Sequence, residues 1–383
     1  MVARTVGIEE ELLLIDPATR FVTGRSPDVL KRHREPRDPS RPQPAVGGLG
    51  QELFQHQLET RTEPVLELSE ALVQLVAGRR AVGVAARAEG VAAVASATVP
   101  LGDQEPQVSP DARYRDMIGA FGEITRMSGT CGMHVHVAID SDDEGVGVID
   151  RMAPWLPILL ATTTNSPYSA GRDTRHMSWR TQLWSLWPSA GKTEAFGSAA
   201  NYYDVRDQLS ATGAATDDGM LYFDARLSVG QPTVEVRVFD VCDDPADAVL
   251  AAALVRALVE HGARDWSRGE PLPRWRAEVL RAAHWRAARL GLTGSLLDPL
   301  VRELRPAREV LESLVATVRT ELVAAGDLDL VTRGVDRVLR GTGATRQRAA
   351  FERLGTIEAV VDDLVERSED VWRDPDAESS VSP

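Results

Sequence analysis

Three apolar segments of this chain carry charged or imidazole side chains at alternate positions. In a β-strand, residues i and i+2 lie on one face of the sheet, and the residue between them lies on the other. Each segment therefore predicts a strand with one polar and one apolar face. The alternating polar positions are Glu9 and Glu11, His134 and His136, and Glu235 and Arg237. Three such strands placed side by side would form the floor of a polar pocket.

Periodicity also divides the chain into a strand-rich part and a helical part. Strands are predicted over residues 6–15, 53–61, 91–99, 131–139, 222–227 and 233–241. Helices are predicted over residues 63–87, 111–127 and 145–164, and helical spacing predominates over residues 246–372. Residues 25–50 lack periodicity and are rich in Arg, Pro and Gly, which predicts an exposed loop. The Trp- and Arg-rich stretch 165–197 is irregular, as binding loops often are.

The chain is long enough to bury a large core. With 383 residues and 43% hydrophobic content, we expect one domain over residues 1–372. Its first part, residues 1–244, is expected to be strand-rich, and its second part, residues 245–372, is expected to be helical. The polar tail over residues 373–383 is expected to be disordered.

Charge and cysteine content argue against several classes of protein. The formal net charge of −14, from 43 basic and 57 acidic residues, disfavours a protein that mainly binds nucleic acid or an anionic membrane. Cys131 and Cys242 provide neither a disulfide framework nor a cysteine-based zinc motif. The charged N-terminus is unlike a signal peptide, and the sequence has no run of about eighteen uncharged apolar residues. We therefore expect a soluble, cytoplasmic protein.

The acidic triplet of Glu9, Glu10 and Glu11 lies within an apolar strand. Consecutive acidic residues usually belong to a solvated helix or loop. Here the residues on both sides of the triplet are apolar, and unpaired carboxylates in such a setting would be costly without a cation. Glu9 and Glu11 would face the pocket, and Glu10 would face the opposite side.

The pair His134 and His136 allows three interpretations: half of a zinc site, a structural pair, or one metal ligand beside one phosphate contact. A zinc site would need a cysteine or a third histidine close by, and His176 could be recruited in space. Carboxylate-rich sites with a little imidazole suit Mg²⁺ or Mn²⁺, which bind phosphate oxygens.

The pair Glu235 and Arg237 could equally be an internal salt bridge. Arg226 lies on the neighbouring predicted strand, so we expect two guanidinium groups to converge there. Two planar guanidinium groups fit a substrate carboxylate or a transferring phosphoryl group. Arg180, in the Trp-rich stretch, is a third candidate. The sequence contains no phosphate loop, Rossmann fingerprint or Gly-x-Ser-x-Gly turn, so a bound nucleotide would be held by metal ions and arginines on a sheet.

Five motifs follow one another in a defined order. They are Gly-Ile-Glu-Glu-Glu from residue 7, Gln-Leu-Glu-Thr-Arg-Thr around Glu59, Cys-Gly-Met-His-Val-His ending at His136, Trp-Pro-Ser-Ala-Gly from residue 187, and Thr-Val-Glu-Val-Arg-Val around Glu235. In this order they resemble the carboxylate–amine ligase family known as glutamate–cysteine ligase type 2, from about Val6 to beyond Leu250. The Gly-Met-His-x-His and Glu-x-Arg strands are similar to those of glutamine synthetase.

This resemblance implies an α+β catalytic domain of the glutamine synthetase-like type, with a curved, mainly antiparallel β-sheet and helices packed on one face. It also implies an ATP-dependent ligase. A carboxylate attacks the γ-phosphorus of ATP to give an acyl phosphate, and an amine then displaces phosphate to form an amide. Positioning and neutralisation of phosphate charge carry such catalysis. The family name indicates glutamate and cysteine as substrates.

The resemblance also assigns roles to residues. The ligands of Mg²⁺ or Mn²⁺ would be Glu9, Glu11, Glu59, His134 and Glu235. His136 and Arg237 would contact a nucleotide phosphate, and Arg237, Arg226 and Arg180 would hold the transferring phosphate or the acid substrate. One departure from the pattern is Arg61, which is close to the proposed ligand Glu59. It could pair with a carboxylate or a phosphate, or it could lie on a different part of the strand.

Two other functions stay open at this stage. The same Glu and His residues could serve a metal-dependent amide hydrolase, or the chain could be a non-catalytic nucleotide sensor on the same fold. The expected partners are ATP and small amino-acid substrates, without nucleic acid or membrane. A homo-oligomer is compatible with the sequence.

Overall fold

An antiparallel sheet lies at the centre of the computed structural model, which describes residues 3–34, 48–102, 105–272 and 274–373. The strand order is β2-β3-β1-β5-β9-β8, and β4 also pairs with β1. The strands are β1 (Val6–Ile15), β2 (Leu49–Gln51), β3 (Gln57–Arg61), β4 (Ala92–Val94), β5 (Gly132–Ala138), β8 (Ala225–Leu227) and β9 (Thr233–Asp240). Two short hairpins lie outside this sheet, namely β6 (Tyr168–Ser169) with β7 (Arg172–Asp173) and β10 (Ser295–Asp298) with β11 (Glu303–Pro306).

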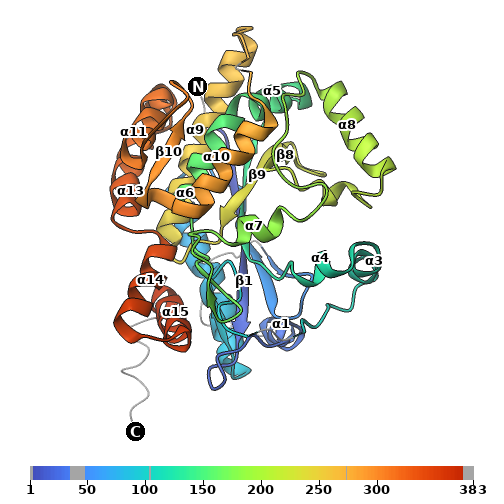
Figure 1. Cartoon of the computed structure of the whole chain (residues 1–383), viewed down its shortest axis with the longest axis vertical. Helices are drawn as coiled ribbons and strands as arrows, with labels where there is room; N and C mark the ends of the chain where they lie inside the picture. The colour runs from blue at the N-terminus through green and yellow to red at the C-terminus, as the bar shows by residue number, and fades with distance from the viewer. Residues whose placement is uncertain (1–2, 35–47, 103–104, 273, 374–383) are drawn as a thin grey trace.

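The helices that pack against the strands of the sheet include α2 (Leu68–Ala88), α5 (Asp142–Met152), α6 (Leu156–Thr162) and α9 (Pro245–Ser267). Figure 1 shows α3 (Ala112–Phe121), α4 (Glu123–Arg126) and α8 (Ala199–Ala211) on the side of the molecule away from α11 (Ala307–Thr317) and α13 (Leu328–Arg340). The remaining helices are α1 (Ser26–Arg34), α7 (Arg180–Trp184), α10 (Ala277–Leu290), α12 (Arg319–Ala325), α14 (Gly343–Leu354) and α15 (Ile357–Trp372).

Strand β1 shows how the sequence determines the two faces of the sheet. From Val6 to Glu11, buried residues alternate with half-buried ones, so Ile8 and Glu10 lie in the interior while Glu9 and Glu11 lie on the opposite face. Residues 12–15 are buried on both faces, where α1, α2 and β4 supply the surrounding side chains. The first half of β1, which carries Glu9 and Glu11, is therefore the half that keeps one face accessible.

The predicted strand over residues 6–15 is confirmed as β1, and the other predicted strands are found at shorter lengths. The predicted helix over 145–164 is interrupted by a 3₁₀ turn containing Pro154, which lacks a backbone donor. The helix predicted over 111–127 is split at Gly122, whose φ is +55°. Helix α8 and the β10–β11 hairpin were not predicted.

The prediction of an irregular loop over residues 25–50 is wrong for its first part, which forms α1. Val29 and Leu30 bury one side of this short helix, and its last turn is entirely basic, which suits the negative end of the helix dipole. Residues 35–47 lie outside the described residues, as does the predicted tail from residue 374 onward.

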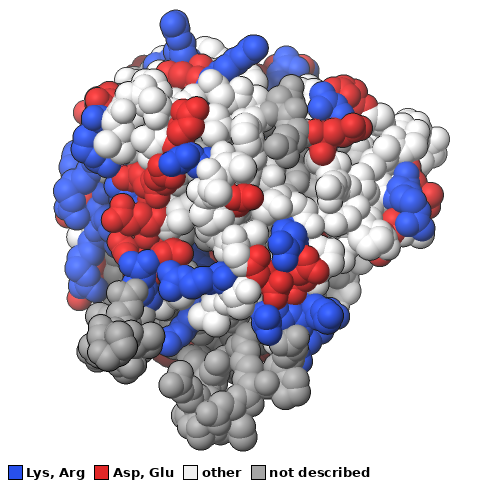
Figure 2. All heavy atoms as spheres, turned by 90° about the horizontal axis from the view of Figure 1, so that it is seen from below, with Lys and Arg blue, Asp and Glu red and all other residues white. Residues whose placement is uncertain are grey.

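Among the described helices, including the 23-residue α9, none is both long and apolar enough to cross a bilayer. Figure 2 shows that acidic and basic side chains are interspersed over the coloured part of the face seen from below.

His56, which precedes β3, gives a prediction about stability. Its ring is stacked on Phe54 with 5.4 Å between centroids, and burial lowers its pKa to about 4. The unfolded chain has a histidine pKa of about 6.5, so between these values the unfolded state binds more protons and stability falls as the pH decreases. We expect the contribution of His56 to the free energy of unfolding to fall by about 2 kcal/mol between pH 7 and pH 5. Urea titrations of the unmodified chain and of His56→Phe should therefore show a difference in stability that changes by about this amount over the range, and a constant difference would contradict this assignment.

Candidate active site

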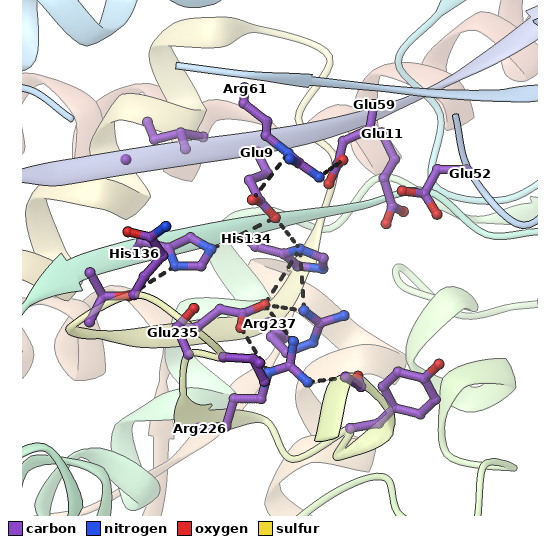
Figure 3. Close-up of a pocket in the computed structure, with 18 of the residues that line it drawn as sticks. Glu9, Glu11, Glu52, Glu59, Arg61, His134, His136, Arg226, Glu235 and Arg237 are labelled. Carbon is purple, nitrogen blue, oxygen red and sulfur yellow. Dashed lines mark hydrogen bonds and ion pairs between the residues drawn. The ribbon is translucent and has the colours of Figure 1, made fainter. Parts of the chain in front are cut away.

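Strand register brings the predicted polar residues into adjacent rows. In the pairing of β1 with its neighbours, Glu9 stands between Arg61 of β3 and His134 of β5. In a second row, Glu235 of β9 stands between His136 of β5 and Arg226 of β8. Elsewhere in the pairing of β1 with β3, Glu11 is opposite Glu59. These side chains line one cavity of about 840 Å³. Figure 3 shows them gathered together above the strands that carry them. The predicted polar pocket on a sheet is therefore present.

The two histidines bracket Glu9. His134 Nδ1 lies 3.2 Å from Glu9 Oε2, and His136 Nε2 lies 3.7 Å from the same oxygen. Burial opposes ionisation of Glu9, but its hydrogen bond with His134 and the nearby imidazole of His136 hold the pKa of this carboxyl well below its usual range. Glu9 is therefore a carboxylate at neutral pH. Burial and the nearby Arg237 lower the pKa of His134, which leaves its imidazole neutral.

Glu235 lies between two guanidinium groups. Arg226 Nε donates to Glu235 Oε2 at 2.7 Å, and Arg237 donates to Oε1. Although burial favours protonation of Glu235, Arg237 and Arg226 lower its pKa strongly, so it too is ionised. The salt-bridge interpretation of Glu235 and Arg237 is thus correct as geometry, and it coexists with their position on the cavity floor.

The two arginines differ in the donors that they have left. Arg226 also donates to the carbonyl oxygens of Gly219 and Leu221, at 2.7 and 3.0 Å. Arg237 Nε is buried without a hydrogen-bond partner among the described residues. Arg237 therefore keeps a donor that the described chain leaves unpaired, whereas Arg226 is largely committed to holding Glu235 and the adjoining loop.

A second group of carboxylates lies beside Glu9 and includes Glu52, which the sequence reasoning missed (Figure 3). Burial and the negative charges of Glu11 and Glu59 raise the pKa of Glu52 well above its usual range. Burial and Glu9 raise the pKa of Glu59 to about 8. Glu52 lies just after the short strand β2 and outside any alternating segment, so periodicity offered no signal for it.

Arg61 is the cation that neutralises part of this group. Its guanidinium contacts Glu59, and its Nε lies 3.4 Å from Glu9 Oε1. Of the two partners considered for this unexpected arginine, a carboxylate or a phosphate, the structure supplies the carboxylate.

These residues fit a divalent cation. Two sets each place one ligand atom per residue within 4.8 Å of the others, namely Glu9, His136 and Glu235, and Glu9, Glu59 and His134. The Nε2 atoms of His134 and His136 are buried without a hydrogen-bond partner in the described chain. Each set offers two carboxylates and one imidazole, which match the preference of Mg²⁺ and Mn²⁺. The zinc alternative would require a cysteine or a third histidine such as His176. Neither of these two sets of described residues contains one.

Arg180 occupies a different place from the other predicted anion-binding residues. It is 2% exposed and lies behind the main cavity, in a narrow space that Arg237 also lines. Its guanidinium lies over the ring of Trp184 at 5.2 Å and against Gly132, where an added Cβ would come within 2.3 Å of Nη2. The glycine of the Gly-Met-His strand is thus needed for close approach of this arginine.

Solved structures share this fold. The crystal structure of a glutamate–cysteine ligase from Francisella tularensis in complex with AMP has a TM-score of 0.64 at 12% identity, covering 98% of this chain and 90% of that one. A bifunctional glutathione synthetase from Pasteurella multocida has a TM-score of 0.63 at 15% identity; the present chain is covered to 97% and spans about half, 53%, of that protein. The predicted α+β fold with a mainly antiparallel sheet is confirmed, and these two solved structures share it.

Sequence comparison identifies much nearer relatives. A Nocardioides sp. protein named "Putative glutamate--cysteine ligase 2-1" is 58% identical over 376 residues, which cover 98% of each chain. A Frankia alni protein named "Putative glutamate--cysteine ligase 2-2" is 48% identical over 366 residues, 94% of this chain and 95% of that one. The family model described as Glutamate-cysteine ligase family 2 matches residues 5–367. The chain therefore belongs to glutamate-cysteine ligase family 2.

Proposed function

We propose that the protein is an ATP-dependent carboxylate–amine ligase that forms an amide through an acyl phosphate. The observation that carries this proposal is that candidate metal ligands lie beside an arginine with an unpartnered donor. Glu9, His134 and Glu235 lie on three adjacent strands, and Arg237 lies beside Glu235 on the same cavity floor. A hydrolase or a sensor would not need this combination of carboxylates and converging guanidinium groups.

In this proposal the cation is held by Glu9, Glu11, Glu59, His134 and Glu235, with Glu52 as an additional carboxylate. A bound Mg²⁺ or Mn²⁺ would neutralise phosphate charge and orient the γ-phosphoryl group of ATP for transfer. Burial and like charges raise the pKa values of Glu52 and Glu59, so a divalent ion is the natural counter-charge for this group.

Arginine and histidine side chains hold the anions. Arg237 offers its unpartnered Nε to an oxygen of the transferring phosphoryl group or of the acid substrate. His136 Nδ1 is 3.1 Å from Thr233 Oγ1, which fixes the ring and leaves Nε2 for a nucleotide phosphate. Arg226 acts by holding Glu235, and Arg180 adds positive charge from behind Arg237.

The reaction needs no nucleophile from the protein. Burial raises the pKa of the Cys131 and Cys242 thiols well above their ordinary range, so neither is a thiolate at neutral pH. The substrate carboxylate attacks the γ-phosphorus, which breaks the bond to the β–γ bridging oxygen and releases ADP. The amine nitrogen then attacks the acyl carbon, loses a proton and displaces phosphate. The protein contributes orientation and charge neutralisation. By analogy with the names of its relatives, glutamate and cysteine are the first substrate pair to test.

A screen for ADP release tests the proposal. The full chain would be incubated with ATP, Mg²⁺ and pairs of amino acids, and products would be identified by mass spectrometry. We expect ADP release that requires both members of one pair, and a product with the mass of acid plus amine minus water. Chelation of the metal with EDTA should abolish the reaction, and excess Mg²⁺ should restore it. Amide hydrolysis without nucleotide, or ATP binding without turnover across a broad panel, would contradict the ligase.

A further inference from the structure

The middle glutamate of the acidic triplet faces away from the cavity. Glu10 is fully buried, and its carboxylate receives two hydrogen bonds from Arg79 of α2, at 2.9 Å from Nε and 2.6 Å from Nη2. Arg79 is itself 3% exposed. The pair is therefore a buried, bidentate ion pair directly behind the strand that carries Glu9 and Glu11.

Arg79 also binds the chain just after β9. Its Nη2 donates to the carbonyl oxygen of Cys242 at 2.6 Å, and its Nη1 donates to that of Asp243 at 2.7 Å. Strands β1 and β9 do not pair with each other, because β5 lies between them. One guanidinium group thus ties together two strands that the sheet hydrogen bonds join only through a third.

The far end of this connection is itself fixed. Arg346 of α14 binds the Asp243 carboxylate with Nε at 2.6 Å, and its Nη2 reaches Asp247 in the first turn of α9 at 2.9 Å. Arg337 of α13 donates to Asp247 as well, at 2.6 Å. The helical last third of the chain therefore holds the residues that Arg79 uses as its anchor.

We infer that Arg79 is a positioning residue that sets the spacing between the carboxylates of β1 and β9. Glu9 and Glu235 contribute to one candidate metal set from these two strands, and metal–ligand distances must be met within about 0.2 Å. Glu10 is the neighbour of Glu9 along the strand, so a change in the height or tilt of β1 at Glu10 moves Glu9 directly. This inference rests on the proposed function, because it is tested by the affinity of the proposed metal site for a divalent ion.

If Arg79 and Glu10 only stabilised the fold, variants that still fold would bind metal normally. If Arg79 positions the ligands, folded variants would bind metal more weakly. Replacing a buried ion pair by apolar residues of similar volume is often neutral or stabilising, whereas removing one partner is destabilising. The double variant Glu10→Leu/Arg79→Met should therefore fold, although it lacks the guanidinium group that donates to the carbonyl oxygens of Cys242 and Asp243. Arg79→Lys keeps the positive charge, but a single ammonium group cannot serve four acceptors in two directions.

The experiment measures Mn²⁺ binding directly, by calorimetry and by electron paramagnetic resonance of the free ion, alongside thermal unfolding. We expect Mn²⁺ affinity to fall roughly tenfold or more in Arg79→Lys and in the double variant, as is usual when a group that orients a ligand is lost. The matched control is Arg256→Met. Arg256 is also 3% exposed and binds Asp327 and the carbonyl of Leu66, away from the cavity.

Arg256→Met should lower the melting temperature without changing Mn²⁺ affinity by more than about twofold. Folded Arg79 variants that bind Mn²⁺ as tightly as the unmodified chain would overturn the positioning role and leave the proposed function intact. An unmodified chain that binds Mn²⁺ but forms no amide with any pair would overturn the proposed function and leave the positioning role testable by the same affinities. A chain that binds no Mn²⁺ would overturn both.

Discussion

Glu235→Gln is expected to abolish metal-dependent ADP release almost completely, with turnover falling roughly a thousandfold. Glutamine keeps the volume of the side chain but removes the negative charge that Arg226 and Arg237 surround. It also removes one of the two carboxylates that Glu9 and Glu235 contribute to the same candidate metal set. We expect Mn²⁺ affinity to fall about a hundredfold, because loss of a residue that only orients a metal ligand already lowers metal affinity by about 10- to 100-fold.

Stability must be measured in the same variant, since two buried guanidinium groups lose their shared partner. Glu144→Gln is the matched control: Glu144 is 7% exposed and pairs with Arg4 at 2.7 Å, outside the cavity. Urea titration should show comparable losses in both variants, whereas only Glu235→Gln should lose Mn²⁺ binding and turnover. Full turnover in folded Glu235→Gln would remove the metal-ligand assignment.

Arg237→Lys is expected to separate anion binding from metal binding. Lysine retains the positive charge beside Glu235 but lacks the Nε–H donor, which has no partner among the described residues. An arginine that stabilises a transferring phosphoryl group is worth roughly 10³-fold or more in turnover. We therefore expect turnover to fall roughly a thousandfold, while Mn²⁺ affinity stays within about threefold because the net charge near Glu235 is unchanged.

Arg226→Lys is the comparison for this variant. Arg226 donates to Glu235 and to two backbone carbonyls, so its replacement should lower the free energy of unfolding more than Arg237→Lys does and should lower turnover less. Single-turnover measurements of ADP formation, with Mn²⁺ titration of each variant, provide the test. Equal losses of turnover and metal affinity in Arg237→Lys would mean that Arg237 only supports the metal ligands.

Parts of the fold were predictable because their signals are local. The alternation in β1 required no partner strand to be recognised, and it also placed Glu10 on the face opposite Glu9 and Glu11, as the structure has it. The long apolar run over 145–164 was recognised as helical, although Pro154 divides it. Helix α1 was not recognised, because its nine residues bury only one short side and have a polar, basic composition.

The candidate site was predictable for residues on alternating strands and not for the others. Glu52 follows a three-residue strand, so no periodicity marks it, yet it lies among Glu11 and Glu59. Arg180 was expected to converge with Arg226 and Arg237, and it does come close to Arg237, but it lies behind the cavity rather than in its lining. Its position depends on the close approach to Gly132, a contact between segments far apart in the chain.

The sequence by itself determined which side chains share a strand face, because that depends only on the two-residue period of an extended chain. It also determined the family, through five short motifs in order. Tertiary structure alone decided which faces meet: register sets Glu9 beside His134 and Glu235 beside His136. It likewise decided that Arg237 keeps a free donor while Arg226 does not, since hydrogen bonds to Gly219 and Leu221 form only once distant segments have packed.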